Sequence, residues 1–217
     1  MSDNQVGTYK LVASPFHLDV RGKLSMGVLG KHLLNCADAY AAERGFDVVE
    51  QGGEHYTWVL SRLAIELEDL PSCHESFSIQ TWVENVYRLF ADRNFVICNK
   101  DEKPIGYVRS VWAMISMETR NPANLLDLHG DRITNSICEK ECPIAKPGRI
   151  KVSQQEAVSE YVAKYSDLDI NGHVNSIKYI EHILDIFPLD TYKKKALKRF
   201  EIAYVAESYY GDALSFY

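Results

Sequence analysis

The sequence has 217 residues, of which 46% are hydrophobic and 25% are charged, a composition typical of a globular protein with one large or two small domains. It has no run of about 18 apolar residues and no basic start followed by an apolar run, so we expect neither a membrane span nor a signal peptide. The net charge of −6 argues against nonspecific nucleic-acid binding, and together these features predict a cytoplasmic protein.

The N-terminal part of the chain predicts a short strand followed by a helix. Residues 9–18 have the residue types of a strand, and the segment after them has apolar residues at helical spacing until Gly45 ends the pattern. The apolar stripe of this helix consists of Met26, Leu29, Leu33, Cys36, Ala37 and Tyr40. Gly27 and Gly30 lie inside the helix at a cost of about 1 kcal/mol each relative to alanine, which predicts that another segment packs closely against them.

Four strand-like segments follow the helix, each rich in β-branched and aromatic residues and bounded by turn residues. They cover residues 56–67, 75–85, 88–99 and 105–117. Several long strands after one helix predict an α+β arrangement in which an antiparallel sheet wraps around the helix. Proline, glycine, asparagine and charged residues then replace the pattern, so we predict a linker over residues 121–153.

The second half of the chain repeats the first. Residues 19–24 (DVRGKL) align with residues 169–174 (DINGHV) at an offset of 150, and residues 60–65 align with residues 197–202 at an offset of 137. An internal repeat predicts one structural unit used twice, with a shorter connection between helix and strand in the second copy.

The two copies differ at positions that can carry chemistry. The differing pairs, first copy then second, are Arg21 and Asn171, Lys23 and His173, and Leu70 and Glu207. If these residues had only structural roles, the two copies would not need to differ at all three positions together. We therefore expect any chemistry to belong to the second copy and the first copy to supply an apolar binding surface.

The candidate site lies at the start of the second helix, where Asp169, Asn171 and His173 occupy alternate positions in a polar segment. Gly172 between them frees the backbone for a tight turn. The free N–H groups and positive dipole end of a helix N-terminus suit a developing oxyanion. Asp169 and Asn171 also suit a turn or a helix cap. His173 and Glu207 also suit solvated surface positions.

Other charged residues of the second copy favour structural interpretations. Glu181 and His182 lie within the helical pattern and are expected at the surface. The lysine run at residues 193–195 is expected to be a solvated face, although it also suits electrostatic steering of an acidic partner.

The register of the repeat aligns Phe216 with Ile79, after which the first copy continues into further strands. We therefore expect the second sheet to be incomplete. Because an open strand edge is a hazard, we expect either a truncated unit or a partner chain, as in a homodimer, that covers the edge.

The five cysteines are odd in number and mostly lie in apolar patterns, which favours reduced thiols. Cys138, Cys142 and His129 lie close together in sequence, but no second Cys or His pair follows at the spacing of a zinc site. We therefore predict neither a metal nor an organic cofactor.

Residues 165–175 (YSDLDINGHVN) resemble the motif that opens the long helix of hotdog-fold thioesterases. Over residues 8–216 the chain is similar to the acyl-acyl-carrier-protein (acyl-ACP) thioesterases of plants and bacteria. The supporting segments are WVLSRL at 58–63, IQTW at 79–82, SVWAM at 110–114, TR at 119–120 and YVAES at 204–208. Several dispersed motifs in one order make the resemblance specific.

The resemblance implies a tandem double hotdog, in which each unit wraps an antiparallel sheet around a long helix. It implies that residues 1–120 form a non-catalytic unit that receives the acyl chain and that residues 154–217 form the catalytic unit. The catalytic set by motif position is Asp169, Asn171, His173 and Glu207. Many plant members carry cysteine after this glutamate, whereas this chain carries Ser208, so we expect no cysteine nucleophile.

The activity implied by the resemblance is hydrolysis of fatty acyl-ACP thioesters, with ACP as the partner and a free fatty acid as the product that ends chain elongation. We expect Glu207 to activate water as a general base and Asn171 and His173 to orient the water or the carbonyl. Backbone N–H groups around His173 and Val174 are expected to hold the oxyanion, and Asp169 to hold the loop.

Alternatives to this activity and mechanism remain open. A covalent anhydride through Glu207 would also cleave a thioester. The alternative functions are an acyl-CoA thioesterase of the same fold and a non-catalytic acyl-binding module.

Overall fold

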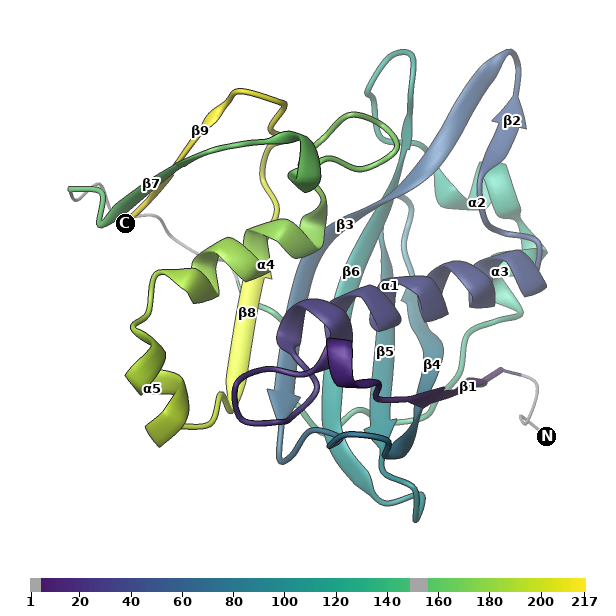
Figure 1. The fold of residues 1–217 in the computed structure, drawn as a ribbon. Coiled ribbons are helices and arrows are strands. Elements are labelled where there is room, and N and C mark those ends of the chain that lie inside the picture. Colours follow the sequence, from purple (N-terminus) through teal and green to yellow (C-terminus); the bar gives the residue numbers. More distant parts are fainter. Residues whose placement is uncertain (1–4, 149–155) are drawn as a thin grey trace.

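A computed structural model describes residues 5–148 and 156–217. Its centre is a seven-stranded antiparallel sheet that curls around the helix α1 (Met26–Glu43) (Figure 1). The sheet contains, in spatial order, β1 (Gly7–Val12), β4 (Ser76–Val86), β5 (Ala91–Cys98), β6 (Pro104–Ser116), β3 (Glu54–Leu67) and β2 (Val49–Gln51), with β8 (Arg199–Ala203) also paired to β3. A separate two-stranded sheet joins β7 (Ser159–Val162) to β9 (Ala213–Phe216).

The predicted helix and four long strands of the first half are confirmed, with small shifts in their ends. The first strand is shorter than predicted, since β1 ends at Val12 and a 3-10 turn follows at Pro15–His17. Ser25 begins α1, because its side chain accepts a hydrogen bond from Val28 N at 3.3 Å.

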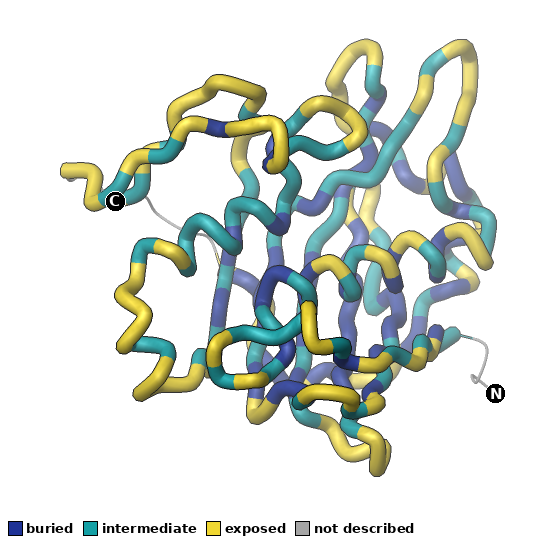
Figure 2. Tube along the Cα trace, viewed as in Figure 1, coloured by how far each residue is buried: buried dark blue, intermediate teal, exposed yellow. Residues whose placement is uncertain are grey.

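The core lies between α1 and the concave face of the sheet. The predicted apolar stripe of α1 is buried, and it packs against inward-facing side chains such as Leu63 and Phe95. Burial of each large apolar side chain contributes about 1.5–3 kcal/mol. Figure 2 shows buried positions concentrated along α1 and the central strands, whereas the loops and the β7–β9 pair are more exposed.

The predicted linker is more structured than its composition indicates. It contains the short helices α2 (Leu125–His129) and α3 (Asp131–Thr134). Leu125 packs with Met114, and the segment after α3 buries Cys138 and Cys142 against Trp82. Isolated apolar side chains therefore hold this segment against the sheet, although they form no periodic pattern. Residues 149–155 lie outside the described part of the chain.

The internal repeat is also present in the backbone hydrogen bonds. Equivalent bonds are Asp19 N to Lys23 O (2.7 Å) and Asp169 N to His173 O (2.8 Å), and Leu24 N to Pro71 O (2.8 Å) and Val174 N to Ser208 O (2.8 Å). The antiparallel pairing of β1 with β4 likewise recurs between β7 and β9. These bonds follow the offsets of 150 and 137 residues read from the sequence, so each copy builds the same loop at its helix start.

The second copy is joined to the first through both a helix and a strand. Its helix α4 (Ser176–Asp185) lies beside α1, with Ile177 against Gly30 and Glu181 against Gly27. The two glycines therefore allow close helix packing. β8 extends the first sheet along the edge of β3, whereas the sequence predicted a sheet around each helix.

Two short helices make up the helical segment of the second copy. α4 stops at Asp185, and Pro188 precedes a further short helix, α5 (Leu189–Lys194), which carries part of the lysine run. Within residues 5–148 and 156–217, no helix is long and apolar enough to cross a membrane.

Candidate active site

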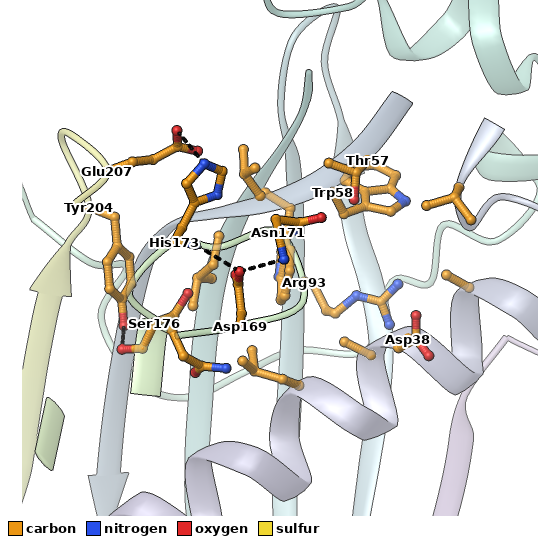
Figure 3. Close-up of a pocket in the computed structure, with 18 of the residues that line it drawn as sticks. Asp38, Thr57, Trp58, Arg93, Asp169, Asn171, His173, Ser176, Tyr204 and Glu207 are labelled. Carbon is orange, nitrogen blue, oxygen red and sulfur yellow. Dashed lines mark hydrogen bonds and ion pairs between the residues drawn. The ribbon is translucent and has the colours of Figure 1, made fainter. Parts of the chain in front are cut away.

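A cavity of about 370 Å³ lies between α1, the sheet and the loop that precedes α4. Its apolar wall comes from the first copy and includes Leu34, Phe46, Val59, Leu60 and Trp112. Its polar wall comes mainly from the second copy. All four predicted site residues border the cavity, namely Asp169, Asn171, His173 and Glu207 (Figure 3). The structure thus brings the four together at one side of the cavity.

Asp169 shapes the loop that carries the other two polar residues. Its Oδ1 accepts hydrogen bonds from the backbone N–H groups of Asn171 at 2.8 Å and His173 at 3.1 Å. Asp19 of the first copy makes the same bonds to the backbone of Arg21 and Lys23. The aspartate is therefore the shared turn residue, and the side chains at positions 171 and 173 make the second copy different.

Glu207 lies beside His173 because a backbone segment after β8 runs antiparallel to the loop. His173 and Tyr209 form an isolated β-bridge, and their rings meet edge to face with centroids 5.0 Å apart. This arrangement places Glu207 Oε2 3.5 Å from His173 Nε2, within ion-pair distance. The imidazole is mostly buried, whereas the carboxylate is 35% exposed and accessible to water.

Arg120 also contacts Glu207, and sequence reasoning did not assign it to the site. It follows β6 in the first copy, with a φ of +60°, and its Nη2 forms an ion pair with Glu207 Oε1. Arg120 also borders the cavity. Glu207 therefore lies between two cationic or cation-forming groups from different copies. The sequence separation of 87 residues gives no signal of this contact.

The backbone N–H groups of His173 and Val174 were expected to form the oxyanion hole, and this prediction is wrong. His173 N already donates to Asp169 Oδ1, and Val174 N donates to Ser208 O at 2.8 Å. These bonds form the turn itself, so neither group is free for a substrate. Among the described residues, the cavity-lining donors that make no hydrogen bond include the side-chain amide of Asn171 and the backbone N–H of Ser176, the first residue of α4. The buried hydroxyl of Tyr179 is another.

A buried cluster of hydrogen bonds around Asp167 fixes the N-terminal end of the loop. Asp167 is 2% exposed and accepts hydrogen bonds from Tyr161 Oη at 2.7 Å, His182 Nε2 at 3.1 Å and Lys164 N at 2.8 Å. The surface position expected for His182 is therefore wrong, because its ring packs on Tyr161 and its side chain is only 12% exposed. Glu181 is likewise packed against α1.

Replacing Asp167 with Asn is expected to lower the free energy of unfolding by about 2–3 kcal/mol, because three donors lose a charged acceptor. Urea denaturation at neutral pH measures the effect. Asp190→Asn, at an exposed position on α5, is the control and is expected to change stability by less than about 0.5 kcal/mol. An Asp167 variant as stable as the wild type would contradict this role.

The same variant has an expected pH dependence. Burial alone would raise the pKa of Asp167, but the hydrogen bonds from Lys164, Tyr161 and His182 outweigh it and lower the pKa. A carboxyl group with a lowered pKa stabilises the fold above its unfolded value, near about 4, and loses this effect as pH falls through the lowered pKa. The stability difference between wild type and Asp167→Asn should therefore shrink in acid.

Three comparisons with known proteins describe what the chain is similar to. The profile of the acyl-ACP thioesterase N-terminal domain matches residues 9–130, and that of the C-terminal domain matches residues 150–217. A chloroplastic palmitoyl-acyl carrier protein thioesterase from Gossypium hirsutum is 25% identical over 180 residues, which cover 80% of this chain and 44% of that protein. The chain thus spans less than half the length of this relative.

Solved structures give a closer match. A crystal structure of an acyl-ACP thioesterase from Bacteroides thetaiotaomicron is 61% identical, with a TM-score of 0.92, and the match covers 99% of this chain and 87% of that one. The 12:0-ACP thioesterase from Umbellularia californica is 16% identical, with a TM-score of 0.79 over 96% of this chain and 80% of that one, and shares the fold.

Proposed function

The chain belongs to the acyl-ACP thioesterase family, and from this premise we propose that it hydrolyses fatty acyl-ACP thioesters to free fatty acids. The observation that carries the proposal is the pair of His173 and Glu207 at the polar side of a mainly apolar cavity. The apolar wall suits an acyl chain, and the polar side suits the thioester carbonyl and a water molecule.

The proposed architecture is a tandem double hotdog. Residues 1–120 form the unit that receives the acyl chain, residues 121–153 connect the units, and residues 154–217 form the catalytic unit. The repeated backbone hydrogen bonds support this division, as does the origin of the cavity walls in different copies.

In the proposed mechanism, Glu207 accepts a proton from a water molecule whose oxygen attacks the thioester carbonyl carbon. The carbonyl electron pair moves to its oxygen, and the Asn171 side-chain amide and Ser176 N–H stabilise the resulting oxyanion. Collapse of the intermediate breaks the carbon–sulfur bond, and the thiolate then takes up the proton. His173 orients Glu207 and the water, while Asp169 fixes the loop.

A second route remains within this proposal. One oxygen of Glu207 could attack the carbonyl carbon directly and expel the thiolate, which leaves a mixed anhydride that water hydrolyses in a second step. Both routes need an ionised carboxylate beside the carbonyl. Arg120 and His173 both lie within ion-pair distance of the Glu207 carboxylate and hold it in place.

We expect Arg120 to act as a positioning residue for Glu207. Arg120→Met should reduce kcat about tenfold while KM changes less than about threefold, because the ion pair holds the carboxylate and not the acyl chain. Steady-state hydrolysis of one acyl-ACP measures both constants. Arg120→Lys should recover part of kcat. If the role of Arg120 were purely structural, Arg120→Met and Arg120→Lys would lose stability equally and Arg120→Lys would not recover kcat.

The carrier is tested by comparing fatty-acid release from acyl-ACP and acyl-CoA that bear the same chain. We expect kcat/KM to be at least tenfold higher for acyl-ACP. A higher value for acyl-CoA would favour the related acyl-CoA thioesterase. Binding of both substrates without release by either would favour the non-catalytic acyl-binding module.

A cytoplasmic location is part of the proposal. All five cysteines are free thiols in the structure, which fits a reducing compartment. A homodimer that covers an open strand edge also remains a prediction, which sedimentation of the purified chain tests.

A further inference from the structure

Arg93 also lines the cavity, and the proposed hydrolysis does not use it. It lies on β5, and its residue is only 6% exposed. Figure 3 shows Arg93 across the cavity from Glu207, with Asp38 the nearest labelled residue in the view. The cavity therefore has a reactive side in the second copy and a guanidinium on its far side in the first.

Arg93 has few partners for a buried cation. Its Nη1 donates to Thr81 Oγ1 at 3.3 Å, and its guanidinium carbon lies 4.6 Å from the ring centroid of Tyr40. Within the described part of the chain, no carboxylate lies within ion-pair distance of it. Asp38 borders the same cavity, but it is exposed on α1 and makes no ion pair with Arg93.

The guanidinium has more donors than these contacts use. Arginine carries five N–H donors in a planar fork, and one is engaged by a side-chain oxygen here. Burial lowers the pKa of Arg93 to about 10, which still leaves it protonated at neutral pH. A buried, protonated group with unused donors is strongly unfavourable unless water or a ligand oxygen occupies its vicinity.

The residues around Arg93 determine which ligand can accept hydrogen bonds from its unused N–H donors. Apolar residues border the cavity near it in the first copy, including Phe46, Val83, Ala91 and Ile133. A saturated acyl chain gains from these contacts, but if it extends to Arg93 it displaces water and offers no acceptor. An acyl chain with an oxygen atom at that depth supplies the acceptor and keeps the apolar contacts.

We propose that Arg93 is a specificity-determining residue that disfavours saturated chains long enough to reach it and favours chains of the same length whose distal end carries an oxygen acceptor. This inference rests on the proposed thioesterase function. Hydroxyl and carboxylate groups share the required chemistry, and separate arms of the experiment distinguish them.

The experiment measures kcat/KM on acyl-ACP series of increasing length with three distal ends: methyl, hydroxyl and carboxylate. For the longest chains, wild type should prefer at least one oxygenated form about 10- to 100-fold over the methyl form. Arg93→Met should reduce that ratio to near one and raise the rate on long methyl-ended chains. A ratio that is near one in wild type, or that is unchanged in Arg93→Met, would overturn the proposal.

Two further variants separate specificity from folding. Arg93→Lys keeps the charge without the planar fork and should retain part of the preference. Arg88→Met removes an exposed arginine outside the cavity and should leave the ratio unchanged. Circular dichroism melting of each variant confirms that the compared proteins are folded.

Binding of free acids keeps this test independent of turnover. Trp58 and Trp112 border the cavity, so their fluorescence reports occupancy by saturated and distally oxygenated fatty acids. If no acyl-ACP is cleaved, the thioesterase proposal fails. If wild type and Arg93→Met then show the same relative affinities for the two kinds of acid, the Arg93 proposal fails as well.

Discussion

Replacing Glu207 with Gln should lower kcat for acyl-ACP hydrolysis about 1000-fold, since general-base catalysis typically contributes about 10²–10⁴-fold. Glutamine has nearly the same shape and can still accept a hydrogen bond from Arg120, but it cannot take a proton from water. Because the Glu207 side chain is 35% exposed, the variant should melt at nearly the wild-type temperature. Release of free fatty acid under saturating substrate measures the effect.

The first copy offers a matched control for Glu207. Lys23, the counterpart of His173, forms an ion pair 2.9 Å long between its Nζ and Oδ1 of Asp69, the residue before Leu70, which is the counterpart of Glu207. Asp69→Asn removes an equivalent charge away from the cavity, and it should leave kcat within about twofold of wild type. If Glu207→Gln retained a tenth or more of the wild-type kcat, the general-base assignment would be wrong.

Asn171→Ala should lower kcat about 100-fold and change KM by less than about threefold, because an oxyanion donor acts mainly in the transition state. The substitution should not disturb the folded loop. Asp169 binds the backbone N–H of Asn171 and not its side chain, so the turn remains intact. Steady-state rates at several concentrations of one efficiently hydrolysed acyl-ACP measure both kcat and KM.

Arg21→Ala is the corresponding control, since Arg21 occupies the same loop position in the first copy. It should alter kcat by less than about twofold. An Asn171 variant with wild-type kcat would remove the Asn171 side chain from the mechanism and would leave the oxyanion to other cavity-lining donors, such as Ser176 N–H.

Periodicity predicted much of the fold because the first copy follows its local patterns. The stripe of α1 repeats at helical spacing, and β3 to β6 are long and rich in β-branched and aromatic residues, so local preference and burial agree. The pairing of β8 with β3 was not predictable, because a free strand edge has no signature in the sequence. The packed linker was missed since Leu125 and Cys138 are isolated apolar residues among turn formers.

The candidate site was predicted where the two copies could be compared. The asymmetry between the copies identified Asn171, His173 and Glu207, and the structure brings all three to one cavity. Arg120 and Arg93 have no equivalent signal, since their significance comes from contacts and burial in three dimensions. The oxyanion donors were misassigned because a sequence does not reveal which N–H groups the turn already uses.

The central claim is that Glu207 directs a water molecule onto the thioester carbonyl, and a single-turnover reaction in ¹⁸O-labelled water tests it most directly. With enzyme in excess over acyl-ACP, the fatty acid released should carry one ¹⁸O atom, and the peptide that contains Glu207 should carry none. Incorporation of ¹⁸O into Glu207 would show attack by the carboxylate and an anhydride. Acyl-ACP that binds but releases no fatty acid would contradict the claim altogether.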